Sequence, residues 1–535
     1  MPGHPRVGAS APGLLLALLA ACGGGGGSGS GTASVATPPA TTVTPPPADP
    51  AWTLGVFQAP ASFAARCAAP RTGTDPVTNR AYVDTAGSVV WENHWLRAWS
   101  NAYYLWYREL PDQNPAASAS TSTYFTLLKS PATTTSGAAK DRFHFTYSTP
   151  DWVSLSQSGV SVGYGAEWAL LQNRPPRRLL VAYFEPGSAA ATAGLRRGAE
   201  ILTADGADVV NASDQASVDR LNAALFPSVV GSHTFTVRDP GATTTRTITM
   251  AAAAVTSVPV QNLRSFATGT GVVGYFLFND HIATAERQLV DAFTQLQSAG
   301  VADLVIDLRY NGGGYLDMAA EVAYMVAGPG RTTNKAFERL AFNDKYPTTN
   351  PITGASISPT PFHATARGLS VASGTPLPTL NLSRVFVLTG PGTCSASESI
   401  INGLRGADVE VIQIGSVTCG KPYGFYPQDN CGTTYFTIQF VGVNDKGFGD
   451  YTDGFRPINT AGAGDARVPG CSVADDFTRD LGDPLEGRLA AALAYRQTRS
   501  CPAATGSNDT RQLAKGDPEL FKPEFLMNRI LGKTL

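Results

Sequence analysis

The chain has 535 residues, a length that suggests about three domains, and 43% of them are hydrophobic, too many for a chain that is disordered throughout. Its 40 Lys and Arg nearly balance its 42 Asp and Glu, so charge gives no reason to expect binding to nucleic acid or to an anionic membrane surface. No apolar run reaches the roughly 18 residues that a membrane-spanning helix needs, and we expect none.

The first 22 residues carry the pattern of an exported protein. An apolar run over residues 13–21 has the length of a signal-peptide core and ends in Leu-Ala-Ala-Cys, followed by five glycines. This ending resembles a bacterial lipoprotein box, which implies that Cys22 is lipidated; an ordinary signal peptide is the alternative. Gly23 implies sorting to the outer membrane. We therefore expect a cell-envelope lipoprotein on the periplasmic side of the outer membrane, touching the membrane through its lipid anchor only.

Two segments precede the first β-rich region. Residues 23–50 are almost entirely Gly, Ser, Thr, Ala and Pro, a composition that predicts a disordered linker. In residues 51–155, aromatic and Leu side chains recur near helical spacing between positions 90 and 106, and a short further helix is expected over 124–129. We therefore predict a helical N-terminal domain in which the aromatic stripe forms a core rather than a ligand site.

Residues 156–256 combine short β runs with glycine turns. The stretch PGSAAATAGLRRGAEILTADG, residues 186–206, resembles a PDZ domain, with Ala199-Glu200 where Asp-Val is usual in that family. The resemblance implies a small β domain whose edge strand binds an extended peptide by strand addition, with the peptide's carboxylate on the loop 159–165. The residues expected to bind the peptide are Val160, Ser161, Val162 and Gly163.

From residue 257 to 465, apolar β runs alternate with amphipathic helical segments. Buried strands are predicted at VVGYFLF, DLVIDL, SRVFVLT and VEVIQIG, with helices between them. The alternation predicts an α/β domain, in which the loop-rich stretch 328–384 could form an insertion or a lid. Residues 466–535 are treated as a C-terminal extension with one helix over 485–496.

Besides Cys22 the chain has six cysteines, and an exported protein can oxidise them. Many pairings are open, and short loops favour Cys419 with Cys431 and Cys471 with Cys501. Neither a C-x-x-C pair nor an H-E-x-x-H motif occurs, and the histidines are scattered. We therefore expect no metal site.

Residues 393–398 read TCSASE, follow a β run and a Gly-Pro-Gly turn, and open a helix. A serine at such a junction lies at a helix N-terminus, where backbone N–H groups stabilise developing negative charge, so Ser395 is a candidate nucleophile. The structural alternative is that Ser395 and Glu398 form the S-x-x-E pattern of a capping box. Cys394 is a weaker candidate, because such a cysteine is more often a small buried hydrophobe.

Lys421 follows the strand VEVIQIG in a Gly-Lys-Pro sequence. A lysine takes a proton from a serine only when it is neutral, which burial promotes; a solvated surface lysine is the alternative. Residues 415–421 also read G-x-x-x-x-G-K, a near match to a phosphate-binding P-loop. Because Pro422 stands where the P-loop has the Ser or Thr that binds magnesium, we do not expect nucleotide binding.

A third motif, DLRYNGGG at residues 307–314, leads from a buried strand into a glycine turn, where backbone N–H groups can approach a reacting atom. Together the three motifs resemble the C-terminal processing, or tail-specific, serine peptidases, over residues 80–460. The resemblance implies a crotonase-like ββα spiral, with Ser395 as nucleophile and Lys421, 26 residues later, as general base. It also implies an oxyanion hole whose donors are Gly313 or Gly314 together with Ala396.

Two departures from that family concern the catalytic residues. Many members carry a Gln four residues after the lysine, where this chain has Phe425; the nearby Gln428 is not assigned. Residues 141–147, DRFHFTY, have one extra residue relative to a D-x-H-[ST]-x-Y-like stretch from which some relatives take a histidine base. His144 is therefore the second candidate for the base, with a hydrogen-bonded structural histidine as its alternative.

These observations predict an envelope serine endopeptidase that cleaves C-terminal tails or unfolded proteins through a Ser–Lys acyl-enzyme. We expect protein or peptide substrates bound by the PDZ domain, no nucleic acid, no metal and no cofactor. One alternative is an inactive family member that binds peptides or hydrophobic ligands, which the missing Gln favours. The other is an acyl-CoA enzyme with the crotonase-like layout, which a PDZ domain and export argue against.

Overall fold

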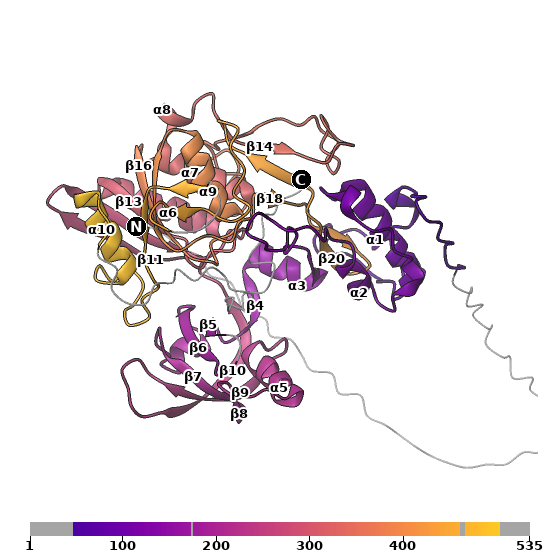
Figure 1. Ribbon diagram of the computed structural model, residues 1–535, viewed down its shortest axis with the longest axis horizontal. Helices are drawn as coiled ribbons and strands as arrows, with labels where there is room; N and C mark the ends of the chain where they lie inside the picture. Colours follow the sequence, from indigo (N-terminus) through magenta and orange to yellow (C-terminus); the bar gives the residue numbers. More distant parts are fainter. Residues whose placement is uncertain (1–46, 173–174, 461–465, 503–535) are drawn as a thin grey trace, which may run out of the picture. The chain divides into compact units, whose positions relative to one another are not determined.

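The computed structural model describes residues 47–172, 175–460 and 466–502 (Figure 1). All of them belong to a single unit of the chain, residues 46–535. The predicted lipidation residue Cys22, the signal peptide and nearly all of the linker lie outside the described residues. Among the residues that are described, no helix combines the length and the hydropathy needed to cross a membrane.

The N-terminal segment is built around helix α1 (Val89–Tyr103), which begins where the Ser88 hydroxyl accepts the Trp91 N–H. Trp95 and Trp99 are buried and stack on each other, so the prediction that the aromatic stripe forms a core is confirmed. The short helix expected over residues 124–129 lies three residues earlier, as α2 (Thr121–Thr126), which begins where the Ser120 hydroxyl accepts the Thr123 N–H. Shorter elements complete the segment: η1 (Pro60–Ser62), β1 (Arg66–Cys67), β2 (Thr85–Ala86), η2 (Tyr107–Glu109), η3 (Pro115–Ala117), α3 (Thr149–Val153) and η4 (Ser154–Ser158).

A β hairpin formed by residues 428–436 completes this N-terminal core. Strands β19 (Gln428–Asn430), β20 (Thr433–Phe436) and β3 (Phe145–Ser148) form one small sheet. Tyr435 on β20 packs against Trp95, and a disulfide joins Cys67 to Cys431 in the hairpin turn. The N-terminal segment is therefore tied, covalently and by packing, to a part of the chain more than 300 residues away.

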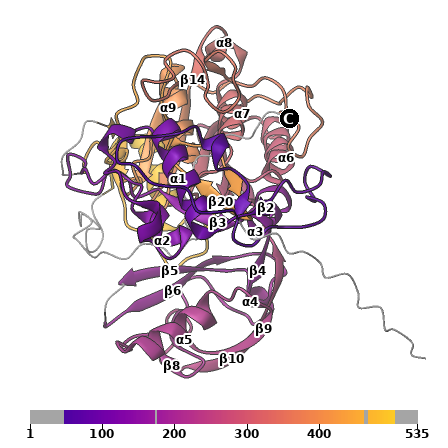
Figure 2. The ribbon, with the colours of Figure 1, turned by 90° about the vertical axis from the view of Figure 1, so that its right-hand side faces the viewer.

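The β-rich segment forms a seven-stranded sheet in the order β4-β10-β9-β7-β6-β5, with β8 paired to β7. Helix α5 lies against this sheet (Figure 2). The core lies between them and includes Trp168, Phe235 and Leu221. The elements are β4 (Val160–Gly163), β5 (Ala166–Gln172), β6 (Arg178–Phe184), α4 (Ala189–Thr192), β7 (Glu200–Ala204), β8 (Ala207–Asp208), α5 (Gln215–Leu225), β9 (Gly231–Arg238) and β10 (Arg246–Thr256).

Residues 160–163 differ from the sequence-based expectation. We expected them in a loop, but they form strand β4 and pair with residues 253–256 of β10. Strand β10 is long enough, Arg246–Thr256, to pair with these residues as well as with β9. The loop between β4 and β5 is therefore reduced to residues 164–165. The strand that lies at the opposite edge of the sheet is β5, paired on one side with β6.

The α/β segment is organised around a six-stranded sheet in the order β11-β12-β13-β16-β17-β24. All neighbours are parallel except β11 and β12. The strands are β11 (Val260–Thr268), β12 (Gly271–Phe278), β13 (Val301–Asp307), β16 (Arg384–Thr389), β17 (Glu410–Gly415) and β24 (Gly470–Ser472). The four strands predicted from apolar runs correspond to β12, β13, β16 and β17.

Alternate residues of these strands enter two different cores, as the period of two in a strand requires. On β12, Phe276 and Phe278 face helices α6 (Ala285–Ser298), α7 (Leu316–Ala327) and α9 (Ala396–Gly406). Val273 and Tyr275 face helix α10 (Gly487–Thr498). Figure 1 shows α10 on one side of the sheet and α7 and α9 on the other.

The C-terminal segment contributes directly to this sheet. Strand β24 extends the sheet beside β17, and α10 covers one face of it. The helix predicted over residues 485–496 is α10, which begins and ends two residues later. The Cys471–Cys501 disulfide, which short-loop reasoning favoured, is present and confirms that prediction.

The stretch predicted to be an insertion or lid contains regular structure. It includes α8 (Pro329–Thr332), β14 (Ala336–Ala341) and β15 (Thr360–Pro361), and β14 joins β21 (Phe440–Val443) and β18 (Tyr423–Gly424) in a four-stranded sheet. A two-stranded pair, β22 (Arg456–Pro457) and β23 (Arg467–Val468), lies beyond it.

Candidate active site

The three predicted motifs follow three neighbouring parallel strands. Strand β13 leads into the turn with Gly313, β16 into the turn with Ser395, and β17 into the loop with Lys421. Because the carboxyl ends of parallel strands meet at one edge of a sheet, segments distant in sequence come together there. The contact is close: a Cβ added to Gly313 would lie 2.8 Å from the Ser395 Cβ.

Ser395 occupies an unusual backbone conformation at the N-terminus of α9. Its φ of +60° and ψ of −115° place a residue with a side chain in the left-handed half of conformational space. The side chain is fully buried, and its Oγ has no hydrogen-bond partner within the described residues. The turn therefore presents an unengaged hydroxyl at a helix N-terminus, as strand–turn–helix nucleophiles do.

The capping-box alternative for Ser395 is realised mainly on the Glu398 side. Glu398 accepts the Ser395 N–H at 2.9 Å, while the Ser395 hydroxyl only faces the N–H of Glu398 without a full hydrogen bond. The same carboxylate accepts the N–H groups of Gly420 (2.9 Å) and Lys421 (2.8 Å) and the Thr418 hydroxyl (2.5 Å). Glu398 thus connects the turn of the serine to the loop of the lysine.

Lys421 is fully buried against aromatic rings. Its Nζ lies 4.4 Å from the ring centre of Phe425 and 5.1 Å from that of Phe143. Phe425 occupies the position at which the resembled family often has a Gln, so an aromatic face borders the amine in its place. Gly420 sits at φ +83°, and a Cβ there would lie 2.4 Å from the Thr452 carbonyl oxygen, so the loop requires glycine before the lysine.

The glycine turn is ordered by Asn311, which sequence reasoning did not single out. The Asn311 Oδ1 accepts the Gly313 N–H at 2.9 Å and lies 2.9 Å from the His281 Nδ1. The Asn311 carbonyl oxygen accepts the N–H of Cys394 at 3.0 Å and the hydroxyl of Ser397 at 3.0 Å. The Gly313 N–H is therefore already donated in this conformation, whereas Gly314 and Ala396 remain the other expected oxyanion donors.

Two family models match this chain, one over the segment that carries the three motifs and one over the N-terminal segment. The model of peptidase family S41 matches residues 270–425, and the model of the peptidase S41 N-terminal domain matches residues 92–148. These two stretches of the chain are therefore similar to peptidase family S41, and together they make up less than half of its residues. Both matches fall on described elements: the first spans β12 to the Lys421 loop, and the second spans α1 to β3.

Two curated proteins that are similar to this chain are C-terminal processing enzymes by name. One is the carboxyl-terminal-processing protease of a Picosynechococcus species, 31% identical over 138 residues, which are 26% of this chain and 32% of that protein. The other is the chloroplastic C-terminal processing peptidase of Tetradesmus obliquus, 31% identical over 249 residues, 44% of this chain and 46% of that protein. The aligned part thus spans less than half the length of either relative.

A solved structure has a fold similar to that of this chain. A candidate S41 protease from Bacteroides fragilis superposes with a TM-score of 0.57 at 23% identity, covering 76% of this chain and 97% of that one. At that identity the likeness concerns the fold alone.

The cysteine pairing near the site differs from the expected pairing. Cys419 bonds to Cys394, next to Ser395, and Cys431 bonds to Cys67, so the predicted Cys419–Cys431 pair is wrong. Short sequence separation was a poor guide because the meeting of β16 and β17 ends brings Cys394 and Cys419 together. Glu398 lies close to both sulfurs, but as long as the disulfide is formed they are not thiolate ligands for a metal ion.

His144 lies in different surroundings from Lys421. Its ring stacks on Phe125 at 3.8 Å and meets Tyr104 edge-on, and its Nδ1 is 3.6 Å from the Asp141 carboxylate. Neither ring nitrogen has a hydrogen-bond partner within the described residues. Burial lowers the pKa of His144 to about 4, so the ring is neutral at pH 7. The neighbouring Phe143, not His144, contacts the Lys421 amine.

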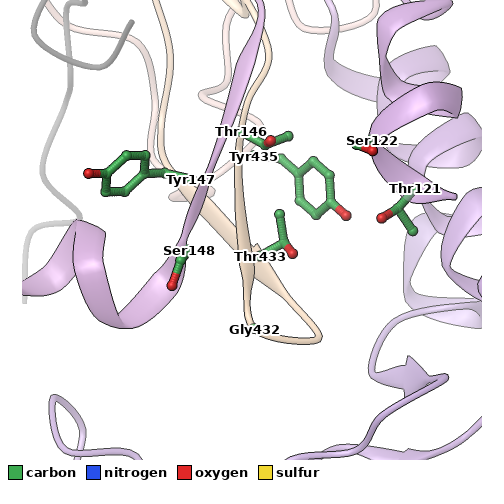
Figure 3. A pocket seen from close by; sticks show the side chains of 8 residues that line it. All are labelled: Thr121, Ser122, Thr146, Tyr147, Ser148, Gly432, Thr433 and Tyr435. Atoms are coloured by element: carbon green, nitrogen blue, oxygen red, sulfur yellow. The ribbon is translucent and has the colours of Figure 1, made fainter. Parts of the chain in front are cut away.

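A pocket of about 350 Å³ lies away from these three turns (Figure 3). It opens between α2, β3 and the turn before β20, and hydroxyl groups dominate its walls, as Figure 3 shows for Thr121, Thr433 and Tyr435. None of the residues predicted to carry the chemistry lines it.

Proposed function

We propose that this chain is a serine peptidase that cleaves C-terminal tails or unfolded proteins by a Ser–Lys mechanism. The observation that carries the proposal is the unengaged hydroxyl of Ser395, held at a strained turn beside a glycine turn and linked through Glu398 to the loop of a buried lysine. The names of the two curated relatives support the same reaction class.

In the proposed reaction, Lys421 in its neutral form takes the proton of Ser395 as Oγ attacks the peptide carbonyl. The protonated amine then gives this proton to the leaving amine, and an acyl-enzyme remains. Water, activated by the same lysine, attacks the ester and releases the acid. The aromatic faces of Phe143 and Phe425 exclude water from one side of the amine, and burial favours its neutral form.

The oxyanion of each tetrahedral intermediate would be stabilised by backbone N–H groups. We favour Gly314 and Ala396 as donors, with Gly313 joining them only if its hydrogen bond to Asn311 is released. One such donor typically contributes a factor of about 10² to 10³ in kcat. Ser395 and Lys421 are both fully buried, so substrate entry requires the segments over them to move.

Substrate binding is proposed for the β-rich segment. We infer a PDZ-like role in which an extended C-terminal tail adds to an edge of its sheet. The residues Val160, Ser161, Val162 and Gly163 stay candidates through the outer edge of β4. The edge of β5 is a second candidate, because the Trp168 indole N–H donates to the Leu225 carbonyl oxygen of α5 and thereby fixes helix and strand side by side.

The location proposed for the protein is the cell envelope, with Cys22 as the lipidated residue. Three disulfides in the described residues are consistent with an oxidising compartment. A second candidate function, a binding protein without peptidase activity, is favoured by one observation: Phe425 stands where the resembled family often has a Gln.

The test is cleavage of a fluorescently labelled unfolded protein with an apolar C-terminal tail by the chain lacking residues 1–22. Ser395→Ala and Lys421→Ala are each expected to lower kcat at least about a thousandfold. His144→Phe and the surface control Lys446→Ala are expected to cleave at the wild-type rate. Loss of activity in His144→Phe with retention in Lys421→Ala would move the base to the histidine. No cleavage by the wild-type chain would favour the binding protein.

A further inference from the structure

We propose that the Cys394–Cys419 disulfide and Glu398 form one clamp that positions Ser395 and Lys421, so that opening the disulfide turns the peptidase off. The inference rests on the proposed function and adds a redox control to it.

The disulfide joins the turn that carries Ser395 to the loop that carries Lys421. Cys394 directly precedes Ser395, and Cys419 lies two residues before Lys421, with 5.1 Å between the two cysteine Cα atoms. The bond therefore ties the turn after β16 to the loop after β17. The backbone repeats the connection, because the Cys419 N–H donates to the Thr393 carbonyl oxygen at 3.0 Å.

Glu398 makes the second connection between the same segments. It receives hydrogen bonds from the backbone N–H of Ser395 on one side and from those of Gly420 and Lys421 on the other. Its side chain is fully buried, and burial raises the pKa of its carboxyl group while these donors oppose the rise. The desolvation cost of a buried carboxylate is offset only while all of its hydrogen-bond donors are in place. The stability of Glu398 therefore depends on the relative position of the two segments, which the disulfide fixes.

Reduction disturbs this arrangement for a physical reason. The Cys419 Sγ lies 3.5 Å from the Glu398 Oε2, so a freed thiol would place an S–H donor, or a thiolate charge, beside the carboxylate. Two thiol sulfurs also cannot approach as closely as bonded sulfurs, and the surrounding residues are fully packed. The Ser395 turn and the Lys421 loop would therefore separate, and small displacements of reacting groups are costly in rate.

The step itself is ordinary thiol–disulfide exchange with a dithiol. A reductant thiolate attacks the Cys419 sulfur, the half-buried member of the pair, and Cys394 leaves as a thiolate that takes up a proton. The second thiol of the reductant then attacks the mixed disulfide and releases Cys419. Two electrons and two protons pass to the protein, and the dithiol becomes a cyclic disulfide.

The consequence is latency in a reducing compartment. A chain that has not yet reached an oxidising environment would carry both thiols and a misaligned site. It would acquire activity only when the disulfide forms.

The first experiment compares two double variants by steady-state kinetics. Cys394→Ala/Cys419→Ala is expected to lower kcat at least tenfold with KM changed less than twofold. The matched control is Cys471→Ala/Cys501→Ala, which opens a disulfide of similar sequence separation, 30 against 25 residues, in the same sheet region. It is expected to keep kcat within twofold of wild type. A wild-type kcat in the first double variant overturns the proposal.

The second experiment reduces the folded wild-type chain with dithiothreitol, which avoids variants that fail to fold. Activity is expected to fall to the level of the first double variant and to return on reoxidation with oxidised glutathione. In parallel samples, the loss of activity should be proportional to the fraction of Cys419 that is alkylated, measured by mass spectrometry. Full activity with Cys419 alkylated overturns the clamp.

A third comparison tests whether Glu398 and the disulfide act as one unit. Glu398→Gln is expected to lower kcat, because its amide presents a donor to N–H groups that need an acceptor. Combined with Cys394→Ala/Cys419→Ala, it should lower kcat no further than the larger single loss. Multiplied losses would show two independent roles and overturn the clamp.

Labelling by a fluorophosphonate separates this proposal from the proposed function, because it reports serine reactivity without a substrate. Absence of cleavage by the oxidised wild-type chain contradicts the proposed function. Equal labelling rates of the oxidised and reduced chains contradict the clamp. Faster labelling of the oxidised chain supports it.

Discussion

At the scale of single residues, the candidate site includes a glycine that is packed too closely to accept a side chain. Gly313 has φ +102°, and an added Cβ would meet the Ser395 Cβ at 2.8 Å and the Ala396 N at 2.9 Å. Both atoms belong to the turn that carries the proposed nucleophile, so a methyl group at Gly313 would displace the serine or one expected oxyanion donor.

Gly313→Ala is therefore expected to lower kcat at least about a hundredfold, because small displacements of reacting groups have effects of that order. Single-turnover cleavage measures the loss. Gly330→Ala is the control, since nothing lies within 4 Å of a Cβ at that helical position. Wild-type turnover by Gly313→Ala would contradict the assigned geometry.

The buried histidines make stability depend on pH. His144 has a pKa of about 4 in the folded chain and about 6.5 when unfolded, and burial lowers the pKa of His281 to about 3. Below pH 6.5 the unfolded state binds protons that the folded state does not, so the free energy of unfolding falls as pH drops.

His144→Phe keeps a ring of similar shape between Phe125 and Tyr104 and removes one of these titrations. Between pH 6.5 and 4, the free energy of unfolding of the variant should fall less steeply than that of wild type, by up to about 1.4 kcal/mol per pH unit. Urea unfolding across this range measures the slopes. Parallel curves would show that His144 does not titrate as its burial implies.

At the scale of elements, helices α6 and α7 fix the loop over residues 367–371 through two buried carboxyl groups. Glu286 on α6 accepts four backbone N–H groups of this loop. Glu321 on α7 accepts the Arg367 N–H at 2.8 Å and donates to Glu286. Burial and the neighbouring Glu286 raise the pKa of Glu321 to about 9, so it is protonated at pH 7.

Because its pKa is raised in the folded chain, Glu321 supports folding fully below about pH 4.5, and this support is lost as pH rises toward 9. Glu321→Gln keeps a donor and an acceptor but does not titrate. The variant should match wild type near pH 4.5 and be the more stable of the two at pH 8. Chemical unfolding at both pH values checks this; a constant difference between them would contradict it.

At the scale of the whole molecule, buried charges join the glycine motif to the C-terminal segment and to the β-rich segment. Arg309, fully buried, pairs with Asp307, Asp475 and, through both Nη atoms, Glu486. Arg197 donates to the Tyr310 hydroxyl at 2.7 Å. Burial alone would raise the pKa of Glu486, but the charge of Arg309 lowers it below its usual range.

Glu486→Ala is expected to lower the free energy of unfolding by about 3–5 kcal/mol, because it removes the bidentate partner of a buried guanidinium. Glu410→Ala is the control, since its pair with Arg499 is exposed and should contribute less than about 1 kcal/mol. Thermal or urea unfolding compares the two. Equal effects would mean that solvent reaches Arg309.

Local pattern was sufficient for most elements, and it supplied Ser395 and Lys421 as candidates whose catalytic roles stay predictions. Apolar runs and helical spacing located β12, β13, β16, β17, α7 and α9, because each of these elements buries apolar residues that recur in the sequence at the spacing of a strand or a helix. Residues 160–163 were expected in a loop because of the resemblance to a PDZ domain, whereas their pairing with β10 makes them a strand. The motifs around Ser395 and Lys421 stood out in the sequence because the proposed catalysis would need particular residue types at particular turns.

What only the tertiary structure decided are relations between distant segments. The pairing of Cys394 with Cys419, the hydrogen bond from the Cys394 N–H to the Asn311 carbonyl oxygen and the hydrogen bonds from the Lys421 loop to Glu398 depend on how the ends of parallel strands meet. A one-dimensional pattern records the period of each element but not its neighbours. The sequence by itself therefore determined which residues are suited to the chemistry, and the fold decided which of them touch.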